Sequence, residues 1–287
     1  MAATDRRIVV VTGASRGAGK GIALALGALG AKVYVTGRSL QEGDAPLPGT
    51  IGATAEEIDR RGGQGVAAHC DHRDDAQVAA LFEHIKAEDG RLDILVNNAT
   101  ALHDDLIKPE PFWEKSLDLV DILDIGLRSA YVASFHAARL MAPRGRGLIV
   151  ATSSFGAGCF MHGPAYGAQK AGLDKMMWDI GVELKPFGVA AASIWMGPLL
   201  TERTERAFAE RADQYEGFAA VAETPQFTGR IIDALARDPA LMSLTGQTLI
   251  GAELAVKYGL TDRDGKQPPS YREMLGPPRD FHPAIIR

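Results

Sequence analysis

The chain has 287 residues, 46% of them hydrophobic, and a formal net charge of -5 at pH 7. This length and composition can support the core of one α/β domain, and the scattered basic residues exclude a nucleic-acid or anionic-membrane footprint. No apolar stretch approaches the ~18 residues that span a bilayer and no signal-peptide pattern is found, so we expect a cytoplasmic protein that binds a small molecule.

Short β-branched segments alternate with helical segments along the chain. Strand candidates occupy residues 7–12, 32–36, 65–70, 93–98, 147–152, 189–195 and 247–250. Helical patterns occupy residues 19–29, 54–61, 76–88, 112–141 and 166–184. This alternation predicts one α/β domain over residues 1–287: a Rossmann-like, doubly wound parallel sheet of six to seven strands with helices on both faces.

A glycine-rich segment, TGASRGAG, follows the first strand and leads into the first helix. Gly13, Gly17 and Gly19 permit a tight turn and a close approach of the backbone to a pyrophosphate, with Ser15 and Arg16 between them. The amides at the start of the following helix favour an anion. The position of this segment therefore predicts a dinucleotide-binding site rather than a plain glycine-rich turn.

The end of the second strand indicates which nicotinamide cofactor binds. A carboxylate about 20 residues beyond the glycine segment would hold the ribose 2'-hydroxyl, but this strand ends in VTGRS. Arg38 can bind a 2'-phosphate in bidentate fashion, and Arg16 adds a second positive charge. NADP(H) is therefore favoured over NAD(H); the alternative is that Arg38 is a solvated surface residue.

The third strand ends in HCDHRDD, where Asp71 can accept a hydrogen bond from the adenine amine of the cofactor. The adjacent His69, Cys70 and His72 raise the alternative of a metal site. Successive strand residues face opposite sides, so the four side chains cannot converge on one ion, and we predict no metal site. Cys70 and Cys159 are the only cysteines and lie far apart in sequence, which fits a reducing compartment.

Four motifs together resemble the short-chain dehydrogenase/reductase (SDR) family from about residue 7 to residue 201. They are TGASRGAG, NNA at residues 97–99, a serine pair after the fifth strand, and YGAQK at residues 166–170. NNAT, GLRSAY, the PAYGAQK segment and AELAVKYGLTD more narrowly resemble the subgroup of dehydrogenase/reductase SDR family member 1. The resemblance implies an NADP(H)-dependent oxidoreductase with Asn98 and Ala99 at the cofactor. It also implies a homo-oligomer, dimer or tetramer, assembled through the fourth and fifth helices.

The family's chemistry assigns roles to three side chains. Tyr166 would protonate the carbonyl oxygen of the substrate as hydride arrives, and a serine hydroxyl would hold that oxygen. Lys170 would bind the nicotinamide ribose. Because Lys170 lies one helical turn after Tyr166, its charge is expected to lower the tyrosine pKa below its usual value of about 10.

Two adjacent serines compete for the catalytic position. Counting forward from Gly147 along the fifth strand indicates Ser154, whereas counting back from Tyr166 by the family's usual separation indicates Ser153. A one-residue deletion in the loop FGAGCFMHGPA reconciles the two counts in favour of Ser154, because loops absorb length changes and strand registers resist them. We therefore predict Ser154, with Ser153 as the alternative.

Two positions depart from the family pattern. Many members carry an asparagine in the fourth helix that holds a water between the lysine and solvent, but Gly126 stands there. Asp124 is a candidate replacement by its proximity in sequence. The family's Pro-Gly turn after the sixth strand reads Met196-Gly197 here, and Gly197 and Thr201 still fit the nicotinamide-binding roles that the resemblance implies.

The residues after the fifth and sixth strands are apolar and aromatic, and ligands of open α/β sheets bind beyond the strand ends. These residues are Phe155, Cys159, Phe160, Met161, His162, Trp195 and Met196. They favour a hydrophobic carbonyl or alcohol substrate. Residues 199–224 are expected to form a charged helical lid. The proline-rich residues 265–287 are expected to form an extended tail that either covers a neighbouring subunit or is poorly ordered.

The leading hypothesis is an NADPH-dependent carbonyl reductase, or the reverse alcohol dehydrogenase. One alternative keeps the fold but prefers NAD. Another is a catalytically silent NADPH-binding regulatory protein, motivated by Gly126 and Met196. The motifs do not encode the physiological substrate or the direction of the reaction, because one fold hosts many reactions.

Overall fold

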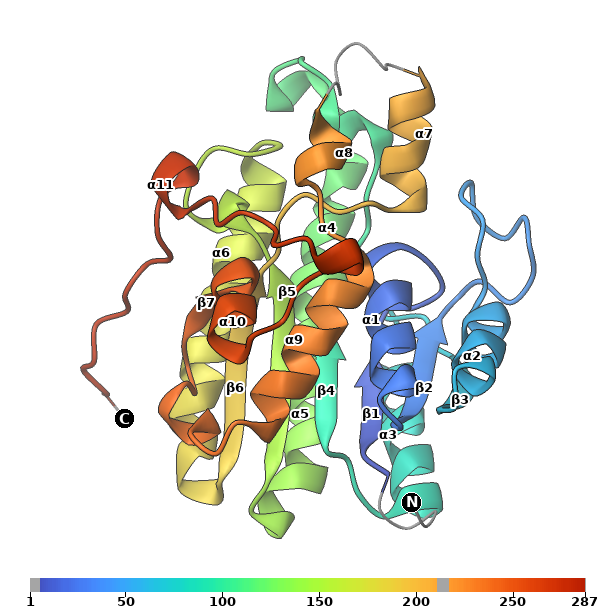
Figure 1. Ribbon diagram of the computed structural model, residues 1–287, viewed down its shortest axis with the longest axis vertical. Coiled ribbons are helices and arrows are strands. Elements are labelled where there is room, and N and C mark those ends of the chain that lie inside the picture. Colours follow the sequence, from blue (N-terminus) through green and yellow to red (C-terminus); the bar gives the residue numbers. More distant parts are fainter. Residues whose placement is uncertain (1–5, 211–216, 287) are drawn as a thin grey trace.

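A computed structural model of the protein describes residues 6–210 and 217–286. Seven parallel strands form one sheet in the order β3-β2-β1-β4-β5-β6-β7 (Figure 1). The strands are β1 (Ile8–Val11), β2 (Lys32–Gly37), β3 (Gln64–His69), β4 (Ile94–Asn97), β5 (Gly147–Ser153), β6 (Val189–Trp195) and β7 (Thr248–Ile250). The predicted doubly wound, Rossmann-like sheet is confirmed.

Helices cover both faces of this sheet (Figure 1). The α-helices are α1 (Gly17–Ala28), α2 (Ile51–Arg60), α3 (Asp75–Asp89), α4 (Asp121–Leu123), α5 (Ser129–Met141), α6 (Pro164–Leu184), α7 (Glu202–Glu210), α8 (Phe218–Val221), α9 (Pro225–Arg237), α10 (Gly251–Tyr258) and α11 (Arg272–Leu275). Helices α1, α2, α9 and α10 share one apolar core with the sheet, and α3, α5 and α6 share the other. Adjacent residues of β1 face opposite cores: Val9 and Val11 lie in the first, and Ile8 and Val10 in the second.

The chain reverses its direction of winding at β1, which lies between β2 and β4. Val11 is in register with Val35 of β2 on one side and with Val96 of β4 on the other. The loops that follow β1 and β4 therefore open at the same edge of the sheet. A crevice at such a switch point is the usual ligand site of an open α/β sheet.

The expected helix over residues 112–141 is wrong in its first part. Residues 104–120 contain three short 3₁₀ turns, and helical structure begins at Asp121, with one π-helical turn at Asp124–Arg128 before α5. Phe112, Trp113 and Leu117 are 61%, 72% and 87% exposed. Apolar spacing stabilises a helix chiefly when the apolar stripe is buried by a neighbouring element, and these residues are not buried.

The C-terminal tail packs on its own subunit. The Tyr271 ring lies 6.0 Å from that of Phe155, and the Phe281 ring lies 5.8 Å from that of Trp178 on α6, measured between ring centroids. Helices α7 and α8 fall in the segment expected to form a lid, of which residues 211–216 lie outside the described residues.

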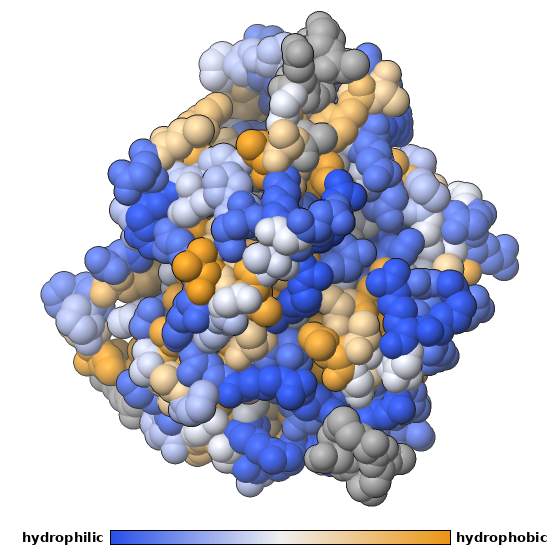
Figure 2. Space-filling model, in the orientation of Figure 1, coloured by the Kyte–Doolittle hydropathy of each residue, from blue (hydrophilic) through white to orange (hydrophobic). Residues whose placement is uncertain are grey.

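The surface is largely hydrophilic on the face in Figure 2, where apolar residues form small separate groups. In the described part of the chain, no helix has both the length and the hydrophobicity that a membrane crossing requires.

Candidate active site

The glycine segment packs tightly against the end of β4. Gly13 has φ +65°, and a Cβ atom on it would lie 2.8 Å from Cα of Ala99. A Cβ atom on Gly19 would lie 2.3 Å from the Gly13 carbonyl oxygen. The side-chain amide of Asn98 donates to the carbonyl oxygens of Thr12 at 3.0 Å and Gly13 at 3.2 Å. A side chain larger than hydrogen is therefore excluded at Gly13 and Gly19 for steric reasons.

The N-terminus of α1 receives no hydrogen bond from the side chain of its own N-cap residue, Arg16. The backbone N–H of Gly17 donates to Oε2 of Glu202 at 2.8 Å. Lys20 lies 3.9 Å from the other oxygen of that carboxylate. Glu202 belongs to α7, so a carboxylate from a distant segment occupies the position expected for a pyrophosphate. A negatively charged phosphate would suit the same amide, because helix N-termini favour anions.

The residues predicted to contact the ribose phosphate gather at the end of β2. Arg38 is exposed and lies 3.7 Å from Asp71. The Arg16 guanidinium donates to Ser39 Oγ at 2.8 Å and to the Gly49 carbonyl oxygen at 2.6 Å. Burial lowers the pKa of Arg16, and the charge of Arg38 acts in the same direction. Arg16 thus anchors the loop after β2, while Arg38 stays accessible. Ser15 is buried within the glycine segment.

The structure brings Ser154, not Ser153, to Tyr166. Ser154 Oγ lies 2.9 Å from the Tyr166 hydroxyl oxygen. Ser153 ends β5, is fully buried, and its hydroxyl donates to the Lys170 carbonyl oxygen at 3.4 Å. Neighbouring residues at the end of a strand point to opposite sides, so only one of the pair can reach the tyrosine.

Lys170 is buried one turn after Tyr166. Its ammonium donates to the Thr152 carbonyl oxygen at 3.1 Å and lies 5.4 Å from the centre of the Tyr166 ring. Burial lowers the pKa of Lys170 to about 8, and the charge of Asp174 opposes that shift. Burial raises the pKa of Tyr166, opposed by its hydrogen bond with Ser154. The expected lowering of the tyrosine pKa by Lys170 is therefore wrong for the protein alone, because the ammonium is directed to a carbonyl oxygen and desolvation dominates.

Gln169 fills the space that Gly126 leaves. A Cβ atom on Gly126 would lie 2.4 Å from Nε2 of Gln169, which donates to the Gly126 carbonyl oxygen at 3.1 Å. Gln169 is buried and directly precedes Lys170. Asp124 is exposed, so it does not take the position of the missing asparagine. The side-chain amide beside Gly126 is therefore that of Gln169, which belongs to α6 and not to the helical segment of Gly126.

The loop after β6 is held by a buried carboxyl that sequence reasoning missed. The Gly197 N–H donates to Oε1 of Glu223 at 3.2 Å, the Leu200 N–H donates to the Glu223 carbonyl oxygen at 2.9 Å, and the Glu223 N–H donates to the Pro198 carbonyl oxygen at 2.8 Å. Glu223 is 1% exposed, and burial raises its pKa to about 8. Thr201 follows this loop, and its N–H donates to Thr204 Oγ1 at 2.7 Å at the start of α7. No local pattern marks Glu223, because its partners are more than 20 residues away in sequence.

The aromatic residues expected to line the substrate space take two different positions. Phe155 and Trp195 are buried against each other at 4.8 Å between ring centroids, and Tyr271 from the tail packs on Phe155. They form a floor rather than an open lining. The His162 ring contacts Tyr166 edge-on at 5.1 Å, whereas Phe160 is 91% exposed. Partly buried residues that pack on the floor include Cys159 and Met161.

Two residues of the His-Cys-Asp-His segment are buried in the fold. His72 is buried, and its Nε2 lies 2.7 Å from Thr36 Oγ1; Cys70 is also buried. Across residues 6–210 and 217–286, no group of three or more His, Cys, Asp or Glu side chains could hold a metal ion.

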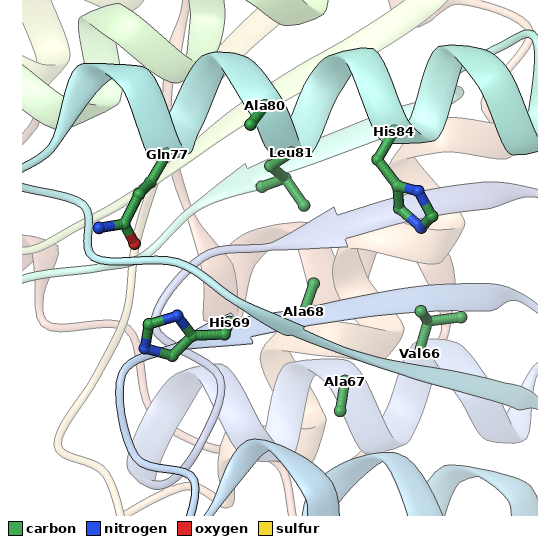
Figure 3. A pocket seen from close by; sticks show the side chains of 8 residues that line it. All are labelled: Val66, Ala67, Ala68, His69, Gln77, Ala80, Leu81 and His84. Carbon is green, nitrogen blue, oxygen red and sulfur yellow. The ribbon is translucent and has the colours of Figure 1, made fainter.

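A groove of about 410 Å³ lies at the outer edge of the sheet, between β3 and α3. Figure 3 shows His69 and Gln77 at one end and Val66 and His84 at the other. Strands β2, β1 and β4 separate β3 from β5, after which Ser154 lies. The groove therefore contains none of the predicted catalytic side chains.

Known proteins resemble this chain over most of its length. Residues 7–212 match the sequence model of the short chain dehydrogenase family. Dehydrogenase/reductase SDR family member 1 from Homo sapiens is 40% identical over 92% of this chain and 86% of its own length. A 3-oxoacyl-[acyl-carrier-protein] reductase from Synechocystis is 31% identical over 86% of this chain and 96% of its own length.

Solved structures agree with this similarity. A short-chain type dehydrogenase/reductase from Mycobacterium marinum has a TM-score of 0.70 and 27% identity, covering 85% of this chain and 93% of its own. A short chain dehydrogenase from Mycobacterium thermoresistibile has a TM-score of 0.72 and 27% identity, covering 90% of this chain and 89% of its own. The resemblance to the SDR family is confirmed. The chain belongs to the short-chain dehydrogenase/reductase family, whose oxidoreductases use nicotinamide cofactors and bind small-molecule substrates.

Proposed function

We propose that the protein is an NADPH-dependent reductase of hydrophobic carbonyl compounds, able to run in reverse as an alcohol dehydrogenase. The observation that carries this proposal is the 2.9 Å contact between Ser154 Oγ and the Tyr166 hydroxyl, with Lys170 buried one turn later. A carbonyl oxygen beside both hydroxyls would receive a hydrogen bond from each. Such donors stabilise the negative charge that develops on the oxygen during reduction.

Tyr166 acts as the acid in this mechanism. Because burial raises its pKa, the phenol stays protonated at neutral pH and is available as a donor. As the carbonyl carbon gains hydride, the Tyr166 proton passes to the oxygen and an alcohol forms. Ser154 orients the carbonyl oxygen throughout, and in the reverse direction the deprotonated Tyr166 would take the proton back.

The described residues fit NADP(H), which would supply the hydride when bound. Two features suit a pyrophosphate: the glycine loop is packed so closely that Gly13 and Gly19 admit no Cβ atom, and the Gly17 amide already binds a carboxylate. We assign the pyrophosphate to Gly13, Ser15, Gly17 and Gly19, the nicotinamide side to Asn98, Ala99, Lys170, Gly197 and Thr201, the 2'-phosphate to Arg16 and Arg38, and the adenine to Asp71.

The floor of Phe155 and Trp195, together with His162 and Tyr271, supports an apolar substrate. The Synechocystis relative is, by its name, a reductase of a 3-oxoacyl group, which is a ketone. Residues 199–224 serve as the lid in this proposal: Arg203 of α7 donates to Asp104 Oδ1 at 2.7 Å and so bridges to the segment after β4.

We further propose a cytoplasmic homo-oligomer, dimer or tetramer, that associates through α5 and α6. Tyr131 and Phe135 of α5 are 60% and 49% exposed, and a contact between subunits would bury them. Light scattering that reports a monomer at micromolar concentration would contradict this arrangement.

Ser154→Ala is expected to reduce NADPH-dependent turnover by about 10²-fold or more, because one donor to the developing oxyanion is lost. Turnover is measured as NADPH consumption across ketones, aldehydes and quinones. Ser153→Ala is the matched control and is expected to retain most activity, since Ser153 does not contact Tyr166. Equal loss in both variants would contradict the assignment of Ser154. A wild-type protein that binds NADPH tightly and turns over no carbonyl would instead support a silent binding protein.

Glu202→Gln is expected to tighten NADPH binding several-fold. The Glu202 carboxylate accepts the hydrogen bond of the Gly17 N–H, so it must leave before a phosphate can bind there. The neutral side chain of glutamine competes less strongly for the positive end of the helix. The dissociation constant is measured by NADPH fluorescence at low ionic strength. Glu205→Gln, in the same turn of α7, is the matched control, and equal constants for the two variants would show that Glu202 does not compete.

A further inference from the structure

Like Glu223, Asp174 is a buried carboxyl, and it lies on α6, the helix that carries Tyr166 and Lys170. Asp174 of α6 comes one turn after Lys170 and is 5% exposed. Its Oδ1 accepts a hydrogen bond from Ser193 Oγ at 2.5 Å, and its Oδ2 accepts one from the indole N–H of Trp195 at 2.8 Å. Both donors belong to β6, so the position of the carboxyl is determined by the sheet as well as by its own helix.

The hydrogen bonds favour the ionised form of Asp174. An indole N–H only donates, so Oδ2 must accept, and donors aimed at a carboxyl favour its charged form. Burial acts the other way and raises the pKa of Asp174, while the hydrogen bonds of Ser193, Trp195 and Ser153 and the charge of Lys170 lower it. A nearby positive charge favours the ionised form of a buried carboxyl further.

Lys170 is the buried cation one helical turn before Asp174 on α6. Residues four apart on a helix are neighbours on one face, and neither side chain forms an ion pair within 4.0 Å in the described part of the chain. The groups around the ammonium are the Thr152 carbonyl oxygen from β5 and the Tyr166 ring from its own helix. Asp174 is the charged group that acts on Lys170, and it opposes the effect of burial.

We propose that Asp174 is a positioning residue that keeps the buried Lys170 ammonium charged and links it, through Trp195, to the floor of the substrate site. This inference deepens the proposed function and rests on it. Trp195 packs on Phe155, which directly follows Ser154. The Asp174 carboxyl, which accepts a hydrogen bond from Trp195, therefore connects the helix that carries Tyr166 and Lys170 to the segment that carries Ser154. Loss of its charge would leave Lys170 alone in a desolvated site and favour the neutral amine.

The test measures the charge of Lys170 directly. Protein labelled with ¹³C at lysine Cε is titrated by NMR, and the Lys170 signal is assigned by its absence in Lys170→Arg. In Asp174→Asn the titration midpoint of Lys170 is expected to fall by one pH unit or more. Asp233→Asn is the matched control, because Asp233 of α9 is also a buried carboxyl but pairs with two other cations, Arg7 before β1 and Arg237. An unchanged midpoint in Asp174→Asn would overturn the proposal.

Two further measurements keep the test decisive. Asp174→Glu retains the charge and is expected to restore the wild-type midpoint. Should Asp174→Asn not fold, the reciprocal experiment follows the ¹³Cγ signal of Asp174 in Lys170→Met, where its midpoint is expected to rise by a similar amount; no rise would overturn the proposal. In the pH profile of turnover, the alkaline limb is expected to move to lower pH in Asp174→Asn. Because the NMR readout needs no turnover, an inactive wild type would refute the proposed function without deciding the role of Asp174.

Discussion

Tyr166→Phe is expected to reduce NADPH-dependent carbonyl reduction by about 10²–10⁴-fold, the usual contribution of a positioned proton donor. The ring of phenylalanine can still pack beside His162 and Lys170, so the loss is confined to the hydroxyl that meets Ser154 at 2.9 Å. NADPH binding is expected to stay close to the wild-type level, because none of the assigned cofactor contacts uses the phenol. The effect should therefore appear in kcat rather than in the dissociation constant of the cofactor.

The matched control is Tyr258→Phe. Tyr258 also donates its hydroxyl to a partner, Asp238 at 2.8 Å, but it lies at the end of α10, away from Ser154. Stopped-flow single turnover with NADPH and a ketone separates the chemical step from binding. Full activity in Tyr166→Phe, or an equal loss in Tyr258→Phe, would refute the role of Tyr166 as the acid.

Arg38→Leu is expected to weaken NADPH binding by about 10–100-fold, the range for one lost charge-assisted contact to phosphate. The Arg38 side chain is 58% exposed and sits beside Asp71 at the end of β2, where it can reach a 2'-phosphate. NADH lacks that phosphate, so its dissociation constant should change little. The ratio of the two constants, measured by fluorescence titration, is the readout.

Arg60→Leu provides the control for a general change in surface charge. Arg60 is also exposed, but it lies in α2 and pairs with Glu57 of the same helix. If Arg38→Leu and Arg60→Leu weaken NADPH equally, Arg38 makes no specific phosphate contact. If the wild type binds NADH more tightly than NADPH, the preference for NADP(H) is wrong.

Local sequence patterns were sufficient to predict the strands of the sheet and the family of this protein. All seven strands were predicted, because short β-branched runs bounded by turn residues form strands wherever both faces of a sheet are covered. The glycine-rich loop after the first strand was also readable from the sequence. Its glycines are required by contacts within a few residues, namely the close approach of Gly19 to Gly13 and the positive φ at Gly13. The motif order from the first strand to YGAQK was enough to indicate the family.

Tertiary structure decided which side chains meet. Residues 112–120 have helical spacing but no neighbour to bury it, so the helix starts later than its pattern indicates. The choice of Ser154 over Ser153 depends on which of two adjacent residues faces α6, a property of strand orientation rather than of composition. The tyrosine pKa was predicted in the wrong direction because one-turn spacing does not show that the ammonium binds a carbonyl oxygen.

The remaining features belong to contacts between distant segments. Glu202 reaches the amide of Gly17 across 185 residues of sequence, and Asp174 receives hydrogen bonds from two side chains of β6. The sequence by itself determined the fold and the family, because both rest on short-range spacing. Only the tertiary structure decided which donors the carboxyl groups meet, because these contacts join segments that are distant in sequence.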